Sequence, residues 1–233
     1  MTNDGADLSQ VLLERARRIS WERWAALTGL LAVVGLVIAT LVQGPIPAAN
    51  APAKQITDFF AQHHDRIMAA MYIRLYAGFA FIWFLATLWS ALARAEGPVA
   101  RVSMVAFGAG IVVLGSSGAA TAVLAAGAFR ASQGVDPALA AALVTAVHMF
   151  YAISGMGTAW MLIATWLINQ RSGIFPPWVA WLGVVFALIS LVLAPFAFGQ
   201  PIVLYAALLT LIWMAIVSVL LFLRPAITQK VSV

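Results

Sequence analysis

Residues 138–168 read ALAAALVTAVHMFYAISGMGTAWMLIATWLI, and His148 is the one histidine among them. A helix that crosses a bilayer needs roughly 20 mostly apolar residues, and this run exceeds that length. It lacks the strict alternation of apolar and polar residues that marks a half-buried strand. In hydrocarbon only helices and closed barrels satisfy the backbone hydrogen bonds. The run therefore predicts a transmembrane helix.

Five further apolar runs surround this one. The six runs cover residues 25–42, 67–92, 102–129, 138–168, 178–198 and 202–223. They predict an all-α fold, an integral membrane bundle of six transmembrane helices over residues 25–223. Residues 1–24 are expected to form a cytoplasmic juxtamembrane segment, in which residues 8–24 read either as a basic amphipathic surface helix or as a solvated tail. Residues 224–233 are expected to form a cytoplasmic tail.

The composition agrees with a membrane protein and excludes other classes. Of the 233 residues 64% are apolar and 9% are charged, and the mean hydropathy is +0.98, whereas soluble domains carry about 45–50% apolar and about 25% charged residues. The net charge of +5 is spread between the apolar runs, so it forms no basic patch for nucleic acid. The absence of cysteine excludes disulfides, thiolate nucleophiles and cysteine-ligated metals.

Lys and Arg residues predict the orientation. A cytoplasmic N-terminus places nine of them inside and three outside, and cytoplasmic loops are normally enriched in these residues. The inner set is Arg15, Arg17, Arg18, Arg23, Arg94, Arg101, Arg171, Arg224 and Lys230, and the outer set is Lys54, Arg66 and Arg130. Both termini are thus predicted to be cytoplasmic, in a bacterial inner membrane. A signal-peptide cleavage at Ala49-Asn50-Ala51 fits poorly, because the first run is longer than a typical h-region.

The longest outer loop covers residues 43–66. Its pattern turns helical from Thr57, with Thr57 as a candidate N-cap and Asp58 in the first turn. This helix is expected to run straight into the second transmembrane helix.

A few polar side chains within the runs are the candidates for a ligand site. Every Asp and Glu lies outside the runs, which argues against a cation-coupled pump and against two-carboxylate catalysis. If their faces converge, the remaining polar groups line a pocket in the outer half of the bundle. The candidate ligand-binding residues are Arg74, Ser116, Ser117, His148, Tyr151, Tyr205 and Thr210.

Structural interpretations compete at each position. Arg74 can reach the outer headgroups by snorkelling, and His148, expected near the midplane, can serve as a polar contact between helices. The spacings Gly115-xxx-Ala119 and Gly118-xxx-Ala122-xxx-Ala126 allow close helix packing or line a cavity.

We predict no catalytic residue, no cofactor and no metal site. A bis-histidine haem needs a second imidazole at the depth of His148, and the runs contain none. His63, His64 and Asp65 are consecutive, so on a helix their side chains fan apart by about 100° each and cannot share an ion.

Residues 171–183, RSGIFPPWVAWLG, resemble an uncharacterised family of bacterial six-helix integral membrane proteins. In that family a fourth helix containing His ends in a short Ser-Gly loop, and Pro and Trp begin helix five. His148, Ser172-Gly173, Pro176, Trp178 and Gly183 fit this pattern. The resemblance covers about 40 residues around helices four and five, and it implies the six-helix topology without implying an activity.

Three functions remain open. The first is binding or transport of a small apolar or amphiphilic molecule. The second is a structural or regulatory subunit that packs against partner membrane proteins or further copies of itself. The third is a membrane-embedded enzyme that uses His148 as acid or base. A cavity that reaches His148 favours the first or third function, whereas a tightly packed core with small residues facing lipid favours the second. In each case the bilayer is a partner and nucleic acid is not.

Overall fold

The computed structural model describes residues 24–131, 133–134, 136–193 and 202–223. Within these ranges the chain is helical and contains no strand, which confirms the predicted all-α class. The segments 1–23 and 224–233 lie outside the described residues, and with them lies nearly all of the predicted surface helix over 8–24. The described helices are α2 (Thr28–Gln43), α3 (Ala53–Gln62), α4 (His64–Glu96), α5 (Arg101–Ala131), α6 (Pro137–Ser172), α7 (Pro177–Leu193) and α8 (Ile202–Leu223).

Four helices are long and apolar enough to cross a membrane. They are the stretch Trp24–Gln43, which includes α2, together with α4, α5 and α6. The helix α7 has 17 residues, and the part of α8 with described side chains, Ala207–Leu223, is also apolar but short. Each of the six predicted runs corresponds to one of these helices, and α3 is an additional helix in the outer loop.

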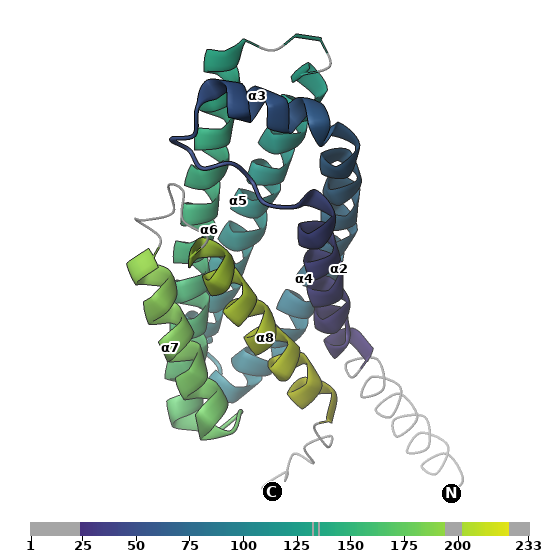
Figure 1. The fold of residues 1–233 in the computed structure, drawn as a ribbon. Coiled ribbons are helices and arrows are strands. Elements are labelled where there is room, and N and C mark those ends of the chain that lie inside the picture. Colours follow the sequence, from purple (N-terminus) through teal and green to yellow (C-terminus); the bar gives the residue numbers. More distant parts are fainter. Residues whose placement is uncertain (1–23, 132, 135, 194–201, 224–233) are drawn as a thin grey trace, which may run out of the picture.

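Six of the described helices pack side by side in a ring. The order of contacts is α2, α4, α5, α6, α7 and α8, and α8 returns to α2. The short helix α3 lies across one end of the ring, where it contacts α5 and α6 (Figure 1). We call this the α3 end. The helix α2 begins and α8 finishes at the opposite end (Figure 1), an arrangement compatible with two termini on one side of a membrane.

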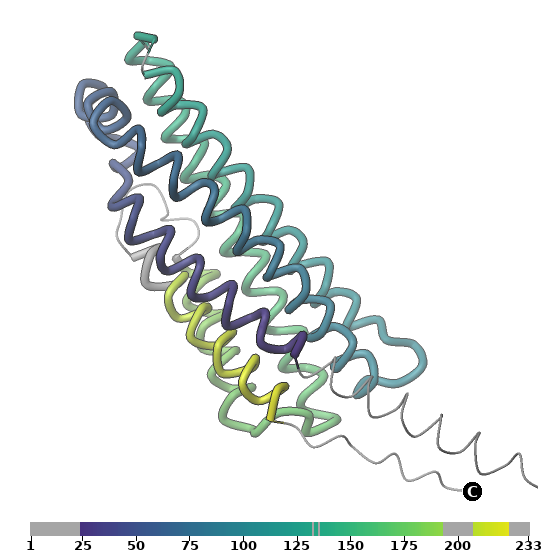
Figure 2. Tube along the Cα trace, turned by 90° about the vertical axis from the view of Figure 1, so that its right-hand side faces the viewer, coloured from purple at the N-terminus to yellow at the C-terminus, as the bar shows by residue number. Residues whose placement is uncertain are grey.

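The helices α4, α5 and α6 are longer than a bilayer requires. They contain 33, 31 and 36 residues, or about 46 to 54 Å at 1.5 Å per residue, against a hydrocarbon thickness of about 30 Å. Figure 2 shows that they extend beyond α2, α7 and α8 at the α3 end. We call α3 and these projecting helix ends the outer cap, after the predicted orientation, which places them outside.

Buried side chains form two separate cores. One lies within the six-helix ring and includes Phe84, Leu88, Leu162 and Trp213. The other lies in the outer cap, where α3 contributes Ile56, Phe59 and Phe60, and the list of its remaining buried members is Ile67, Ala120, Leu124, Ala128, Ala140, Val144 and Val147. The outer core explains why apolar residues continue along α5 and α6 past the length that a membrane needs.

The outer loop departs from its sequence prediction. The helix α3 begins at Ala53, after Pro52, rather than at Thr57. The Thr57 hydroxyl donates to the Lys54 carbonyl oxygen at 2.9 Å, so the prediction of Thr57 as an N-cap is wrong. The prediction of one continuous helix is also wrong, because the chain turns at His63, whose φ is −113° and ψ is 15°, before α4 begins.

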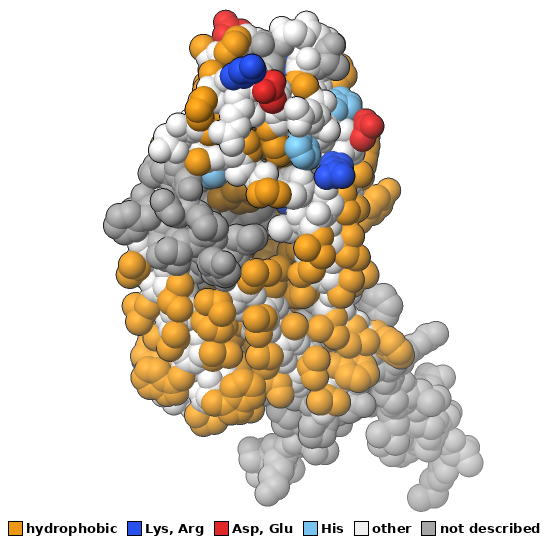
Figure 3. Space-filling view, in the orientation of Figure 1, with side chains coloured by type: hydrophobic (Ala, Val, Ile, Leu, Met, Phe, Trp, Pro, Cys, Tyr) orange, Lys and Arg blue, Asp and Glu red, His pale blue; other side chains and the backbone are white. Residues whose placement is uncertain are grey.

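Charged and apolar side chains occupy different parts of the surface. In Figure 3 the charged and His side chains gather at the α3 end, and apolar side chains cover most of the described surface below. The exposed acidic residues Asp58 and Asp65 belong to α3 and the first turn of α4. The exposed residues Arg94, Arg101 and Arg171 lie at the other ends of α4, α5 and α6.

Candidate functional site

Arg74 joins α4 to the end of α2. Its guanidinium donates a hydrogen bond to Oε1 of Gln43, the last residue of α2, and Gln43 is 2% exposed. This contact satisfies the side chain of a buried amide, which would otherwise be costly to desolvate. The described partner of Arg74 therefore belongs to a neighbouring helix.

His148 holds the segment that follows α2. Its Nε2 lies 2.9 Å from the carbonyl oxygen of Pro47, and because that oxygen can only accept, Nε2 carries the donating proton. Arg74 and His148 thus bind the two ends of the short segment 43–47.

His148 lies closer to the end of α2 than its predicted place near the midplane. The prediction counted its depth from the start of the apolar run at residue 138. In the structure the first turns of α6 belong to the outer cap, because Ala140, Val144 and Val147 pack in its core. The count therefore overestimated the depth of His148 in the bundle.

The two serines of α5 make local and interhelical contacts. Ser116 is buried and its hydroxyl donates to the Val112 carbonyl oxygen at 2.6 Å. The hydroxyls of Ser117 and Ser154 lie 2.9 Å apart and join α5 to α6. Nearby, the backbone of α6 approaches α5 closely at Gly157, where an added Cβ would lie 3.1 Å from the Ala109 carbonyl oxygen.

The remaining candidates lie elsewhere in the bundle. Tyr151 is half-buried and packs against the outer core. Thr210 is half-buried on α8. Tyr205 also belongs to α8, but its side chain lies outside the described residues. The hydrogen bonds of Arg74, Ser117 and His148 join different pairs of elements, so these three candidates do not share a hydrogen-bonded site.

Two pockets in the described part of the chain are lined by other residues. The first, about 740 Å³ in volume, lies between residues 45–52 and α3, and Lys54, Asp58 and His63 line it. The ring of His63 stacks on Phe59, with centroids 5.0 Å apart. His64 also has a structural contact, because its Nδ1 lies 2.9 Å from the Ala128 carbonyl oxygen.

The second pocket, about 550 Å³ in volume, lies where α6 turns into α7. Asn169 is 5% exposed, and its Oδ1 accepts a hydrogen bond from the Phe175 backbone N–H at 2.6 Å. Gly173, with a φ of 59°, finishes α6 in the left-handed conformation that glycine favours. Sequence reasoning expected this turn from Ser172-Gly173 and Pro176, but it did not single out Asn169.

Glu96 is a further residue that sequence reasoning missed. Its two carboxylate oxygens accept hydrogen bonds from the backbone N–H groups of Val102 and Ser103 at 2.8 and 2.7 Å. Burial raises the pKa of Glu96, but these hydrogen bonds outweigh it and hold the pKa below its ordinary value of 4.5. The carboxylate thus caps the first turn of α5, and its place before the Gly97-Pro98 turn was the available signal.

One face of α5 carries small residues that no described residue covers. Added Cβ atoms at Gly108, Gly115 and Gly118 would meet nothing within 4 Å, and Ala122 and Ala126 are exposed farther along the helix. Other glycines, such as Gly110, Gly127 and Gly157, lie where neighbouring helices of the chain come close to one another. The small-residue spacings in 102–129 therefore lie on the outside of the described bundle, and the expectation that they line a cavity is wrong for these glycines.

The chain matches no protein-family model, no curated protein and no solved structure. The resemblance carried by residues 171–183 therefore stays a prediction.

Proposed function

We propose that this protein crosses a bacterial inner membrane six times, has both ends in the cytoplasm, and serves as a structural subunit of a membrane assembly. The observation that carries the structural role is that polar side chains within the bundle join helices to one another and to the segment that follows α2. Arg74, Ser117 and His148 contact Gln43, Ser154 and the Pro47 carbonyl oxygen, respectively. Such contacts between helices stabilise membrane bundles by roughly 0.6 to 2 kcal/mol each.

The distribution of charge and tryptophan supports the orientation. Arg94, Arg101 and Arg171 lie at the ends of α4, α5 and α6 away from α3, and Lys54, Arg66 and Arg130 lie at the α3 end. The excess of Lys and Arg that is typical of a cytoplasmic side therefore comes from residues 15–23 and 224–230 of the sequence. Trp178 and Trp181 are exposed in the first turns of α7, at the end away from α3. Exposed tryptophans at this level fit an aromatic belt at the membrane surface.

The outward face of α5 supports an assembly. Glycine costs up to about 1 kcal/mol relative to alanine within a helix, and Gly108, Gly115 and Gly118 have no neighbour in the described chain that requires them. Small residues let two membrane helices approach closely. The partner we propose is a second copy of this chain, because a two-fold axis can pair this face with itself.

The first experiment separates a structural role from a ligand site. We expect Arg74→Ala and His148→Ala to lower the thermal stability of the purified protein, by roughly 1 kcal/mol each. Arg130→Ala and Met149→Ala, at exposed positions on α5 and α6, serve as controls and should have little effect. The proposal is contradicted if neither variant loses stability and an added amphiphile stabilises the native chain but not the variants.

The second experiment tests the assembly. Since the chain has no native cysteine, Gly118→Cys can be oxidised in membranes without background. We expect a disulfide-linked dimer for Gly118→Cys and none for Ala86→Cys, which is exposed on α4. We also expect Gly115→Leu to weaken the dimer while the thermal stability of the monomer is kept. Equal cross-linking at positions 118 and 86, or none at 118, argues against the α5 interface.

A further inference from the structure

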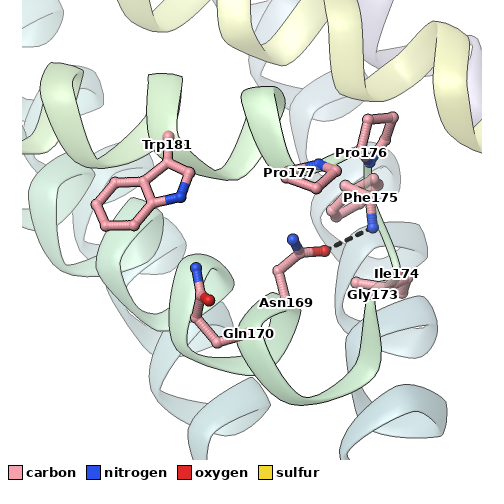
Figure 4. A pocket seen from close by; sticks show the side chains of 8 residues that line it. All are labelled: Asn169, Gln170, Gly173, Ile174, Phe175, Pro176, Pro177 and Trp181. Carbon is pink, nitrogen blue, oxygen red and sulfur yellow. Dashed lines mark hydrogen bonds between the residues drawn. The ribbon is translucent and has the colours of Figure 1, made fainter.

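A pocket between α6 and α7 is lined by side chains that can donate hydrogen bonds. It is formed by the last turn of α6, the connecting residues 173–176 and the first two turns of α7 (Figure 4). Its volume of about 550 Å³ falls in the range of small-ligand pockets. None of its lining residues is acidic, and the full list is Asn169, Gln170, Gly173, Ile174, Phe175, Pro176, Pro177 and Trp181.

Asn169 presents a donor to this pocket. Its Oδ1 accepts the Phe175 N–H, so the amide orientation is fixed and Nδ2 is left on the pocket side (Figure 4). Among the described residues its side chain makes only that one hydrogen bond. Asn169 is 5% exposed, and an acceptor atom of a ligand in the pocket would accept a hydrogen bond from its Nδ2.

Two other side chains can donate into the same space. Gln170 and Trp181 line the pocket, and Figure 4 shows their nitrogen atoms on its inner side. The ring of Trp181 is held in place by edge contact with Trp166, at a centroid distance of 5.5 Å. Donors from α6 and α7 therefore converge on one volume.

The local electrostatics favour a negatively charged ligand. The positive end of the α7 dipole lies at Pro177, and the exposed cation Arg171 follows Gln170. The carbonyl oxygens at the end of α6 carry partial negative charge and oppose this positive potential, but two of them already accept hydrogen bonds. The Gly173 N–H donates to the Asn169 carbonyl oxygen and the Ser172 hydroxyl donates to that of Ile168, both at 2.9 Å.

We infer that this pocket binds a phosphate group, with the headgroup of an anionic phospholipid of the adjacent leaflet as its source. Phosphate offers several acceptor oxygens to the N–H groups of Asn169, Gln170 and Trp181. The exposed Trp178 and Trp181 belong at the depth of lipid headgroups, which favours a lipid over free phosphate. This site is independent of the α5 interface.

Native mass spectrometry of the full chain with added phosphatidylglycerol tests the inference. We expect bound lipid on the native chain and about tenfold weaker binding for Asn169→Asp, which keeps the acceptor for Phe175 but replaces the donor by a negative oxygen. Asn50→Asp makes the same change at an exposed outer position and should bind as the native chain does.

A second variant and a competition experiment complete the test. The variant keeps the inference testable if Asn169→Asp does not fold, and the competition distinguishes a lipid headgroup from free phosphate. Trp181→Phe keeps the ring and removes its N–H, and we expect it to weaken lipid binding several-fold even if Asn169→Asp does not fold. A competing titration with inorganic phosphate supports the phosphate site if phosphate displaces the lipid, and supports a lipid headgroup as its source if it does not. The inference is overturned if folded Asn169→Asp and Trp181→Phe both bind phosphatidylglycerol as tightly as the native chain, or if the native chain binds neither phosphatidylglycerol nor phosphate.

Discussion

At the scale of single residues, Glu96 illustrates how one carboxylate organises the start of a long helix. Its two oxygens accept from Val102 and Ser103 in the first turn of α5, where the backbone N–H groups have no partner within the helix. Negative charge at that position also interacts favourably with the helix dipole.

Glu96→Gln should lower the stability of the protein by about 1 kcal/mol at neutral pH, because it removes that charge. The folded pKa lies below 4.5, so the stabilisation is complete above pH 4.5 and is lost as the pH falls through the folded value. Thermal unfolding at about pH 7 and about pH 3 should therefore show a difference between native and variant chains that shrinks in acid. Asp58→Asn, at an exposed position on α3, serves as the control. A difference that is independent of pH speaks against the capping role.

The glycines of α5 distinguish an inner from an outer face. An alanine Cβ at Gly127 would lie 2.4 Å from Cζ of the fully buried Phe60. We expect Gly127→Ala to lower the free energy of unfolding by about 1 to 3 kcal/mol through overpacking, whereas Gly118→Ala keeps or raises it by up to about 1 kcal/mol through helix propensity. Thermal unfolding of both variants is the measurement, and the reverse order would show that the faces of α5 are assigned wrongly.

At the scale of elements, the outer cap depends on α3. Phe60 is fully buried and contacts Gly127 of α5, and α3 closes the core that the projecting ends of α4, α5 and α6 would otherwise expose. The cap is thus a small folded unit attached to the end of a membrane bundle.

Phe60→Ala should destabilise this unit by about 3 to 5 kcal/mol, as expected for a large-to-small change in a packed core. Phe60→Ala should raise the hydrogen-exchange rates of α3 and the first turns of α4 relative to the native chain, and it should raise those of α7 less. Phe79→Ala, at a position that is 58% exposed on α4, should leave the cap unchanged. Uniform destabilisation of the whole chain by Phe60→Ala would contradict a separate outer core.

The sequence predicted the helices well because a long apolar run has few structural solutions in a membrane. It predicted their surroundings less well. The apolar composition of 138–147 is the same whether lipid or α3 covers those residues, so the depth of His148 could not be read from it. The sequence also could not show whether Gly115 and Gly118 face the inside or the outside of the bundle. Small-residue spacing allows a close helix contact, but it does not identify the helix that makes the contact. The break at His63 also depends on α3 packing against α5 and α6.

At the scale of the whole molecule, the start of α2 and the end of α8 lie at the same side of a ring of six helices (Figure 1). Arg94, Arg101 and Arg171 lie at the side where α2 begins and α8 finishes, and the α3 end carries the exposed acids Asp58, Asp65 and Asp136 together with Lys54, Arg66 and Arg130. The structural role, the α5 interface and the headgroup site between α6 and α7 all assume this placement in the membrane.

Labelling of single cysteines with a membrane-impermeant maleimide tests this placement most directly, because the native chain contains no cysteine. We expect Gln133→Cys, between α5 and α6 at the α3 end, to be labelled in intact spheroplasts. Ser172→Cys at the end of α6, and cysteines at the two chain ends (Thr2→Cys and Val233→Cys), should be labelled only after lysis. Labelling of either chain end from outside, or protection of Gln133→Cys until lysis, would contradict six crossings with both ends in the cytoplasm.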